Sequence, residues 1–143
     1  MHPDSKKPAF QKVLVIDDNP TDRYIANRIL QKYHFAEEIV LLESGTKALE
    51  YLKTLSDVPE ELPQFIFLDI RMPEMDGFDF LDHFANLPQC IQEHCVILML
   101  STSSHPDDLN RIESSPYVYQ FLNKPFDKSN MEELEKRFVS KRM

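Results

Sequence analysis

Acidic side chains follow two apolar runs of this sequence, at the point where each run ends. The first run ends in Asp17 and Asp18, and a later one ends in Asp69. Three carboxylates brought close together repel one another unless a cation binds between them. Carboxylate oxygens in a partly hydrated cluster suit Mg²⁺ (or Mn²⁺), which binds a few carboxylates together with a phosphate. A carboxylate can also be a nucleophile and form an aspartyl phosphate.

Two further apolar runs end in groups that can hold the oxygens of a phosphoryl group. Ser101 and Thr102 supply hydroxyl hydrogen-bond donors, and Lys124 supplies a positive charge. Together with a cation, such groups neutralise the charge that is spread over phosphoryl oxygens. The residue types therefore indicate phosphoryl chemistry, provided that the fold brings the four run ends together.

The apolar runs have the length and composition of buried strands. They are short, unbroken and rich in β-branched or aromatic residues, which is typical of parallel strands buried on both faces. Amphipathic stretches that favour helices alternate with them. We predict strands at 13–16, 39–42, 65–68, 96–100 and 118–122, and helices at 21–33, after Gly45, from Gly77 to about Asn86, at 106–113 and from Asp127 onward.

Strands that alternate with helices predict an α/β fold. Such a chain forms a parallel five-stranded sheet with helices on both faces, a three-layer sandwich. In open sheets of this kind the ligand site lies beyond the carboxyl ends of the strands, and the polar run ends all fall at that edge. The length of 143 residues suits one domain.

The composition excludes several classes of function. The net charge of −8, from 24 acidic and 16 basic residues, argues against direct binding to nucleic acid or an anionic membrane, since both need a basic face. Cys90 and Cys95 lack a CxxC spacing, so we expect free thiols in a reducing, cytoplasmic location. No apolar run is long enough to span a membrane. The sequence contains no Walker A segment, so we do not expect direct use of ATP.

Four segments resemble the signature segments of response-regulator receiver domains, which act in two-component signal transduction. The resemblance extends from about Lys12 to Arg137, so we assign 1–11 to an N-terminal extension and 12–143 to a receiver domain of the stand-alone, single-domain type. It implies a flavodoxin-like (βα)5 fold with strand order 2-1-3-4-5. The four segments are Val13–Asn19, Phe67–Gly77, Met99–Ser101 and Phe121–Phe126.

The resemblance implies a role for each acidic residue at the strand ends. Asp69 resembles the phosphoacceptor, and Asp18 resembles the direct metal ligand beside it. Asp17 resembles an acidic partner that acts on the metal largely through water. The backbone carbonyl of Arg71 occupies the position of a further metal ligand.

The resemblance also implies a set of switch residues. Lys124 resembles the lysine that pairs with the acceptor and then with the phosphate, and its bond to Pro125 is expected to be cis. Ser101, with Thr102 beside it, resembles the switch hydroxyl that moves toward the phosphoryl group. Phe121 occupies the position of the switch aromatic residue, where it lacks the hydroxyl of the more familiar tyrosine.

The implied function is that of a signalling phosphoacceptor rather than an enzyme with a separate substrate. The phosphoryl donor is expected to be a histidine kinase or a histidine phosphotransfer protein, because no histidine of this chain resembles a donor site. An output protein is expected at the face formed by 106–113, 118–122 and the last helix. We expect a monomer or a weak phosphorylation-dependent dimer. The sequence does not distinguish a protein that passes the phosphoryl group along a relay from a diffusible regulator.

Two other functions are compatible with parts of the pattern. A Mg²⁺-dependent phosphatase of the haloacid-dehalogenase type also uses a strand-end aspartate, but that class needs Asp-x-Asp where this chain has Asp69-Ile70-Arg71. A degenerate receiver would bind proteins without being phosphorylated. The presence of every core site residue argues against that alternative.

Overall fold

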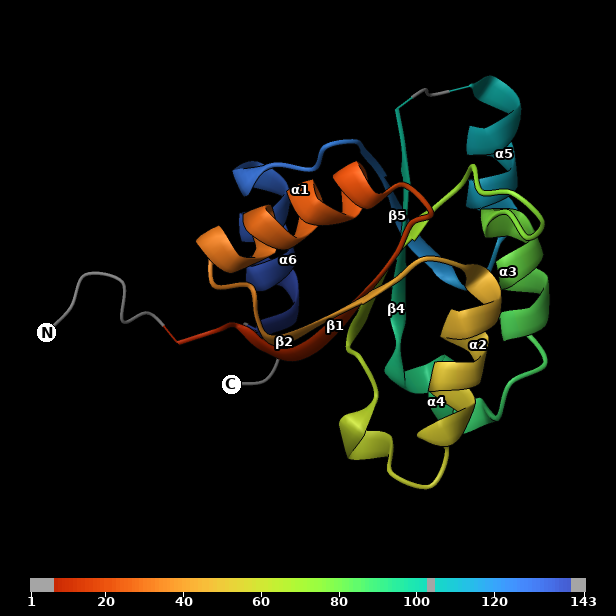
Figure 1. The fold of residues 1–143 in the computed structure, drawn as a ribbon, viewed down its shortest axis with the longest axis horizontal. Helices are drawn as coiled ribbons and strands as arrows, with labels where there is room; N and C mark the ends of the chain where they lie inside the picture. Colours follow the sequence, from red (N-terminus) through yellow and green to blue (C-terminus); the bar gives the residue numbers. More distant parts are fainter. Residues whose placement is uncertain (1–6, 103–104, 140–143) are drawn as a thin grey trace, which may run out of the picture.

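Five parallel strands form one sheet through the centre of the molecule (Figure 1). The computed structural model describes residues 7–102 and 105–139. The strand order is β2-β1-β3-β4-β5, and every neighbouring pair is parallel, so the predicted fold class and strand order are confirmed. The strands are β1 (Phe10–Ile16), β2 (Ala36–Leu42), β3 (Phe65–Asp69), β4 (Val96–Ser101) and β5 (Val118–Asn123).

The sequence predicts one helix after each strand, but the described residues contain one α-helix more than that. The additional helix is α4, six residues that bury only Ile91, so its sequence offers no apolar stripe to detect. The helix expected at 106–113 is therefore α5. The helices are α1 (Pro20–Lys32), α2 (Gly45–Thr54), α3 (Gly77–Phe84), α4 (Gln89–His94), α5 (Pro106–Ser114) and α6 (Lys128–Val139), with a 3-10 turn at Pro59–Glu61.

The first strand begins earlier than the sequence indicates. Its first residue is Phe10, and the backbone N–H groups of Ala9 and Phe10 donate to the carbonyls of His34 and Phe35 at 3.1 and 3.0 Å. The end of the range 1–11, assigned above to an N-terminal extension, is thus part of the sheet.

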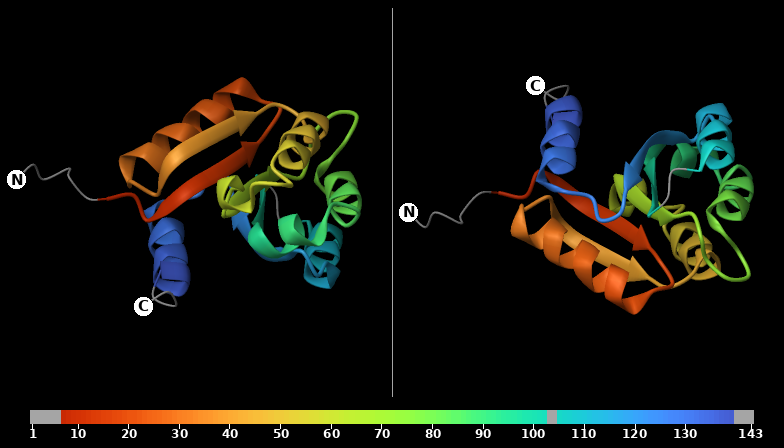
Figure 2. Two further views of the ribbon diagram at one scale, coloured as in Figure 1. Left: turned by 90° about the horizontal axis from the view of Figure 1, so that it is seen from below. Right: turned by 90° about the horizontal axis from the view of Figure 1, so that it is seen from above.

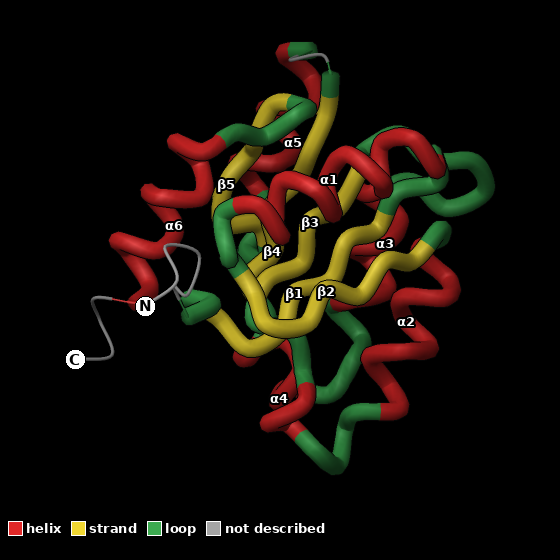
Figure 3. The backbone as a smooth tube through the Cα atoms, turned by 60° about the vertical axis from the view of Figure 1, so that its left-hand side comes forward, coloured by secondary structure: helices red, strands yellow, loops and turns green. Residues whose placement is uncertain are grey.

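Apolar side chains of the strands pack into two cores, one on each face of the sheet. Leu14 and Ile16 belong to the core that includes α2, α3, α4 and α5, whereas Val13 and Val15 belong to the core that includes α1 and α6. Figure 2 shows these two groups of helices on opposite sides of the sheet, and Figure 3 shows the strands side by side. Every residue of β3 is buried, as expected for a central strand covered on both faces.

The turn after β1 is fixed by a helix cap. The Asn19 side chain accepts hydrogen bonds from the backbone N–H groups of Thr21 and Asp22 at 2.9 and 3.1 Å, and Pro20 occupies the first helical turn. This cap sets the direction in which α1 leaves the sheet edge that carries Asp17 and Asp18. In the part of the chain that the structure describes, no helix is long and apolar enough to cross a membrane.

Candidate functional site

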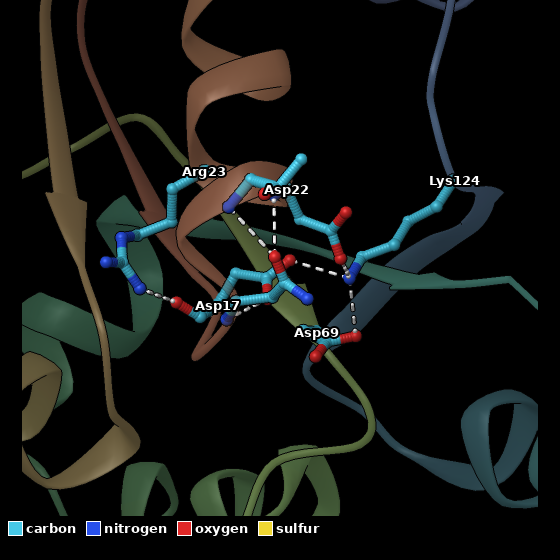
Figure 4. A network of polar contacts seen from close by, with 7 residues as sticks. Asp17, Asp22, Arg23, Asp69 and Lys124 are labelled. Carbon is cyan, nitrogen blue, oxygen red and sulfur yellow. Dashed lines mark hydrogen bonds and ion pairs between the residues drawn. The ribbon is translucent and has the colours of Figure 1, made fainter.

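Three carboxylates and a lysine meet beyond the carboxyl ends of β1, β3 and β5. Figure 4 shows Asp17, Asp69 and Lys124 of this group. One carboxylate oxygen from each of Asp17, Asp18 and Asp69 lies within 4.8 Å of the other two. Lys124 Nζ lies 2.6 Å from Oδ2 of Asp17 and 3.2 Å from Oδ1 of Asp69. The parallel register explains the meeting, since Ile16 pairs with Leu68 and both strands then end at the same level.

The acids of this cluster differ in their contact with solvent. Asp17 and Asp69 are buried, with 2% and 5% of their surface exposed, whereas Asp18 is exposed. Asp17 is held by the start of α1, because its Oδ1 accepts from the backbone N–H of Asn19 at 3.0 Å. Its carbonyl also accepts from the Arg23 guanidinium at 2.8 Å. A cation bound here would therefore be open to water on the Asp18 side.

Burial is the main cause of the altered acidity at the centre of the site. It raises the pKa of Asp69 to about 6, and the neighbouring charge of Asp17 adds to the rise, while Lys124 opposes both. For Lys124, burial lowers the pKa, but hydrogen bonds to Asp17 and Asp22 outweigh it, and the pKa lies above its ordinary value. The lysine is therefore protonated at neutral pH, and it offsets part of the negative charge of the cluster.

Asp22 is a member of this network that the sequence pattern did not reveal. Its Oδ2 accepts a hydrogen bond from Lys124 Nζ at 2.9 Å, so that the lysine contacts three carboxylates (Figure 4). The sequence feature that could have identified Asp22 is its spacing of three residues from the helix cap at Asn19. The third residue after a helix cap such as Asn19 lies in the first turn, next to the strand end from which the helix starts.

The two predicted hydroxyl residues lie at the same edge, whereas the predicted aromatic residue lies within β5, opposite Met99. Ser101 is buried at the end of β4, and its carbonyl accepts from the backbone N–H of Lys124 at 2.9 Å. Thr102 lines a small cavity together with Lys124 and other residues of α1 and the β5–α6 connection. Phe121 of β5 is partly buried, and the peptide bond between Lys124 and Pro125 is cis.

The side chain of Arg71 points to a different partner. Its guanidinium donates to the carboxylate of Asp108 in α5. The backbone just before it is fixed, because Ile70 N–H donates to the Leu100 carbonyl at 3.0 Å and the Ile70 carbonyl accepts from Gly77 N–H at 2.8 Å. The segment after Asp69 is thus tied to both β4 and α3.

Residues 13–136 match the family described as the response regulator receiver domain. The chain belongs to this family. The resemblance carried by its four signature segments is therefore confirmed over nearly the whole chain.

Solved receiver structures have the same fold. A two-component response regulator from Cytophaga hutchinsonii has a TM-score of 0.85 at 27% identity, and the match covers 94% of this chain and 99% of that one. The bacteriophytochrome response regulator AtBRR has a TM-score of 0.71 at 28% identity, with 91% and 92% covered.

Sequence relatives contain the receiver either as most of the protein or as a small part. The two-component response regulator ORR3 of Oryza sativa subsp. indica is 32% identical over 129 residues, covering 90% of this chain and 91% of ORR3. The probable methanogenesis regulatory protein FilR2 of Methanothrix harundinacea is 28% identical, with 89% and 83% covered. The sensor histidine kinase CheAY of Helicobacter pylori is 31% identical over 92% of this chain, which spans 15% of that kinase.

The donor set of this receiver fits a hard divalent cation. Three carboxylates supply oxygen ligands, and the exposure of Asp18 leaves room for the waters that Mg²⁺ keeps. Burial and the charge of Asp17 raise the pKa of Asp69, and a cation bound beside it would favour the ionised form.

Proposed function

We propose that this receiver domain accepts a phosphoryl group on Asp69, with Mg²⁺ (or Mn²⁺) bound beside it. The observation that carries the proposal is the position of Lys124, whose Nζ lies 3.2 Å from Asp69 and 2.6 Å from Asp17. A protonated lysine in contact with the acceptor carboxylate is placed to contact an oxygen of a phosphoryl group bound there.

Asp17, Asp18, Asp69 and the backbone carbonyl of Arg71 would hold the ion. When bound, it would neutralise the charge of the acidic cluster and of the incoming phosphoryl oxygens. Asp17 would act on it largely through water, as its Oδ2 is already in contact with Lys124.

The reaction itself is a displacement by Asp69. A carboxylate oxygen of Asp69 attacks phosphorus, and the bond from phosphorus to the histidine nitrogen of the donor breaks, so the nitrogen leaves with the electron pair. The donor would be a histidine kinase or a histidine phosphotransfer protein. Apart from this transfer and its own dephosphorylation, the domain would carry out no chemistry on a separate substrate.

The output would follow from a local change of charge. Phosphorylation adds about one unit of negative charge and three acceptor oxygens at Asp69. The hydroxyls of Ser101 and Thr102 would donate to those oxygens, and Phe121 would change position beside them. We propose that an output protein, or the partner copy of a weak phosphorylation-dependent dimer, reads the change at the face of α5, β5 and α6. The monomeric resting state and the cytoplasmic location stay predictions.

The proposal is tested by the intact mass of the protein after incubation with acetyl phosphate. With Mg²⁺, the wild type is expected to gain one phosphoryl group, and the chelated sample is expected to gain none. Asp69→Asn should gain none under either condition, whereas Asp82→Asn, which changes an exposed acid on α3, should behave as the wild type. A folded wild-type protein that gains no mass would contradict the proposal and would favour a receiver that binds partners without phosphorylation.

A further inference from the structure

An ion pair joins the acceptor segment to α5. The Arg71 guanidinium donates to Oδ2 of Asp108, and the two residues are 37 positions apart in sequence. The Asp108 side chain is 7% exposed, whereas that of Arg71 is 61% exposed. The carboxylate therefore lies inside the protein, while the cation reaches it from the solvent side.

The buried carboxylate depends on this cation. Asp108 lies in the first turn of α5, where the helix dipole stabilises a negative charge to a small extent. That contribution is much smaller than the cost of leaving a buried carboxylate without its ion-pair partner. If Arg71 leaves, Asp108 needs water in place of the guanidinium, and a movement of the first turn of α5 would supply it.

A second contact makes α5 rest on the same segment. The Arg111 guanidinium lies 3.8 Å from the centre of the Phe78 ring at the start of α3. Figure 1 shows α5 and α3 on the same side of the sheet. The preceding residue, Gly77, is packed so closely that a Cβ atom there would lie 2.8 Å from the carbonyl oxygen of Asp69. A displacement of the Asp69 backbone would therefore press on the start of α3, which Arg111 of α5 contacts.

We propose that Arg71 exchanges its partner, leaving Asp108 for the phosphoryl group on Asp69, and that the exchange releases the first turn of α5. The inference rests on the function proposed above. Lys124 is already shared among three carboxylates, so it does not match the added charge by itself. Arg71 follows the acceptor by two residues, and guanidinium groups bind phosphoryl oxygens in pairs. Asp108 is thus a positioning residue that holds Arg71 away from the acceptor in the unphosphorylated state.

Hydrogen–deuterium exchange of the backbone amides of α5 tests this exchange. The useful amides begin at Leu109, whose N–H donates to the His105 carbonyl at 3.1 Å. Asp108→Asn in the unphosphorylated protein should exchange about tenfold faster than the wild type in these amides. Asp107→Asn is the matched control, since it changes the adjacent acid, whose side chain is 86% exposed and lies 4.0 Å from His105.

Phosphorylation distinguishes an exchangeable pair from a merely structural one. Acetyl phosphate with Mg²⁺ should raise α5 exchange in the wild type and in Asp107→Asn to the level of Asp108→Asn. It should add little in Asp108→Asn or in Arg71→Gln, because in these variants the pair is already broken. The double variant should exchange like each single variant.

The intact mass of the same samples separates failure of this inference from failure of the proposed function. A wild type that is fully phosphorylated, with α5 exchange unchanged, would overturn the exchange of Arg71 and leave the phosphoacceptor role intact. A folded wild type that gains no phosphoryl group would overturn both. Equal α5 exchange in unphosphorylated Asp108→Asn and Asp107→Asn would show that the ion pair does not hold the helix.

Discussion

At the scale of single residues, the buried carboxylate of Asp69 lowers the free energy of unfolding when it is ionised. Its pKa of about 6 lies above the ordinary value of 3.8, because burial and the charge of Asp17 disfavour the ionised form. Between these two pH values the folded state binds more protons than the unfolded state. The free energy of unfolding therefore falls as the pH rises from about 4 to about 6, and the full penalty is present above pH 6.

Asp69→Asn should remove this penalty. Without divalent metal at pH 7.5, we expect its free energy of unfolding to exceed that of the wild type by about 1–3 kcal/mol, because the amide carries no charge to bury. The difference should vanish below about pH 4, where the wild-type acid is protonated in both states. Urea denaturation of both proteins with a chelator, from pH 4 to pH 8, measures it. The exposed acid changed in Asp82→Asn should show no such gain, and an Asp69→Asn less stable than the wild type at pH 7.5 would contradict the argument.

At the scale of elements, the junction of β3 and α3 sets the position of the acceptor. A Cβ on Gly77 would lie 2.8 Å from the Asp69 carbonyl oxygen and 3.0 Å from the Ile70 Cα, and neither backbone atom can move easily. Gly45, the first residue of α2, is also crowded. Its nearest atoms, however, are Sδ and Cγ of Met75 at 2.7 and 3.2 Å, which belong to a flexible side chain.

Gly77→Ala should therefore lower the free energy of unfolding by about 1–3 kcal/mol through overpacking. It should also slow phosphorylation by acetyl phosphate, because relief of the clash displaces the backbone of Asp69. Gly45→Ala is the matched control, and it should change stability by less than about 1 kcal/mol, since Met75 can move and alanine favours the helix. Urea denaturation and the rate of mass gain measure the two effects. Equal behaviour of the two variants would show that the close approach of Gly77 to Asp69 does not matter.

At the scale of the whole molecule, two cores stabilise a sheet whose carboxyl edge collects negative charge. The net charge is −8, and the structure gathers Asp17, Asp22 and Asp69 around Lys124, with Asp18 beside Asp17 and Asp69. A ligand that binds this edge only in the folded state stabilises the entire domain by mass action.

Mg²⁺ should therefore raise the melting temperature of the protein. At 100 times its dissociation constant, an ion contributes about 2.7 kcal/mol, and for a chain of this size that corresponds to a rise of about 5–10 °C. Differential scanning fluorimetry over a Mg²⁺ titration measures the shift. Asp18→Ala should lose most of it, while Asp82→Ala should retain it. A shift of the same size in Asp18→Ala would exclude Asp18 as a ligand.

The amino-acid sequence by itself determined the strands and the edge at which polar residues gather. The apolar composition of short runs such as Val13–Ile16 and Phe65–Leu68 is enough to predict buried strands. Their alternation with amphipathic helices is also a local pattern that the sequence shows directly. The strand order came from the resemblance to receiver domains. Helix α4 escaped prediction because six residues with one buried side chain carry too little periodicity.

Only the tertiary structure decided which side chains are partners. The hydrogen bond from Lys124 to Asp22 joins residues 102 positions apart, and the pair of Arg71 with Asp108 joins the β3–α3 segment to α5. Spacing along the chain places a residue at a strand end or in the first turn of a helix. The direction of its side chain and the partner that it meets depend on how the helices pack against the sheet, because long side chains such as Arg71 and Lys124 reach several neighbours and bind the one that packing brings within reach.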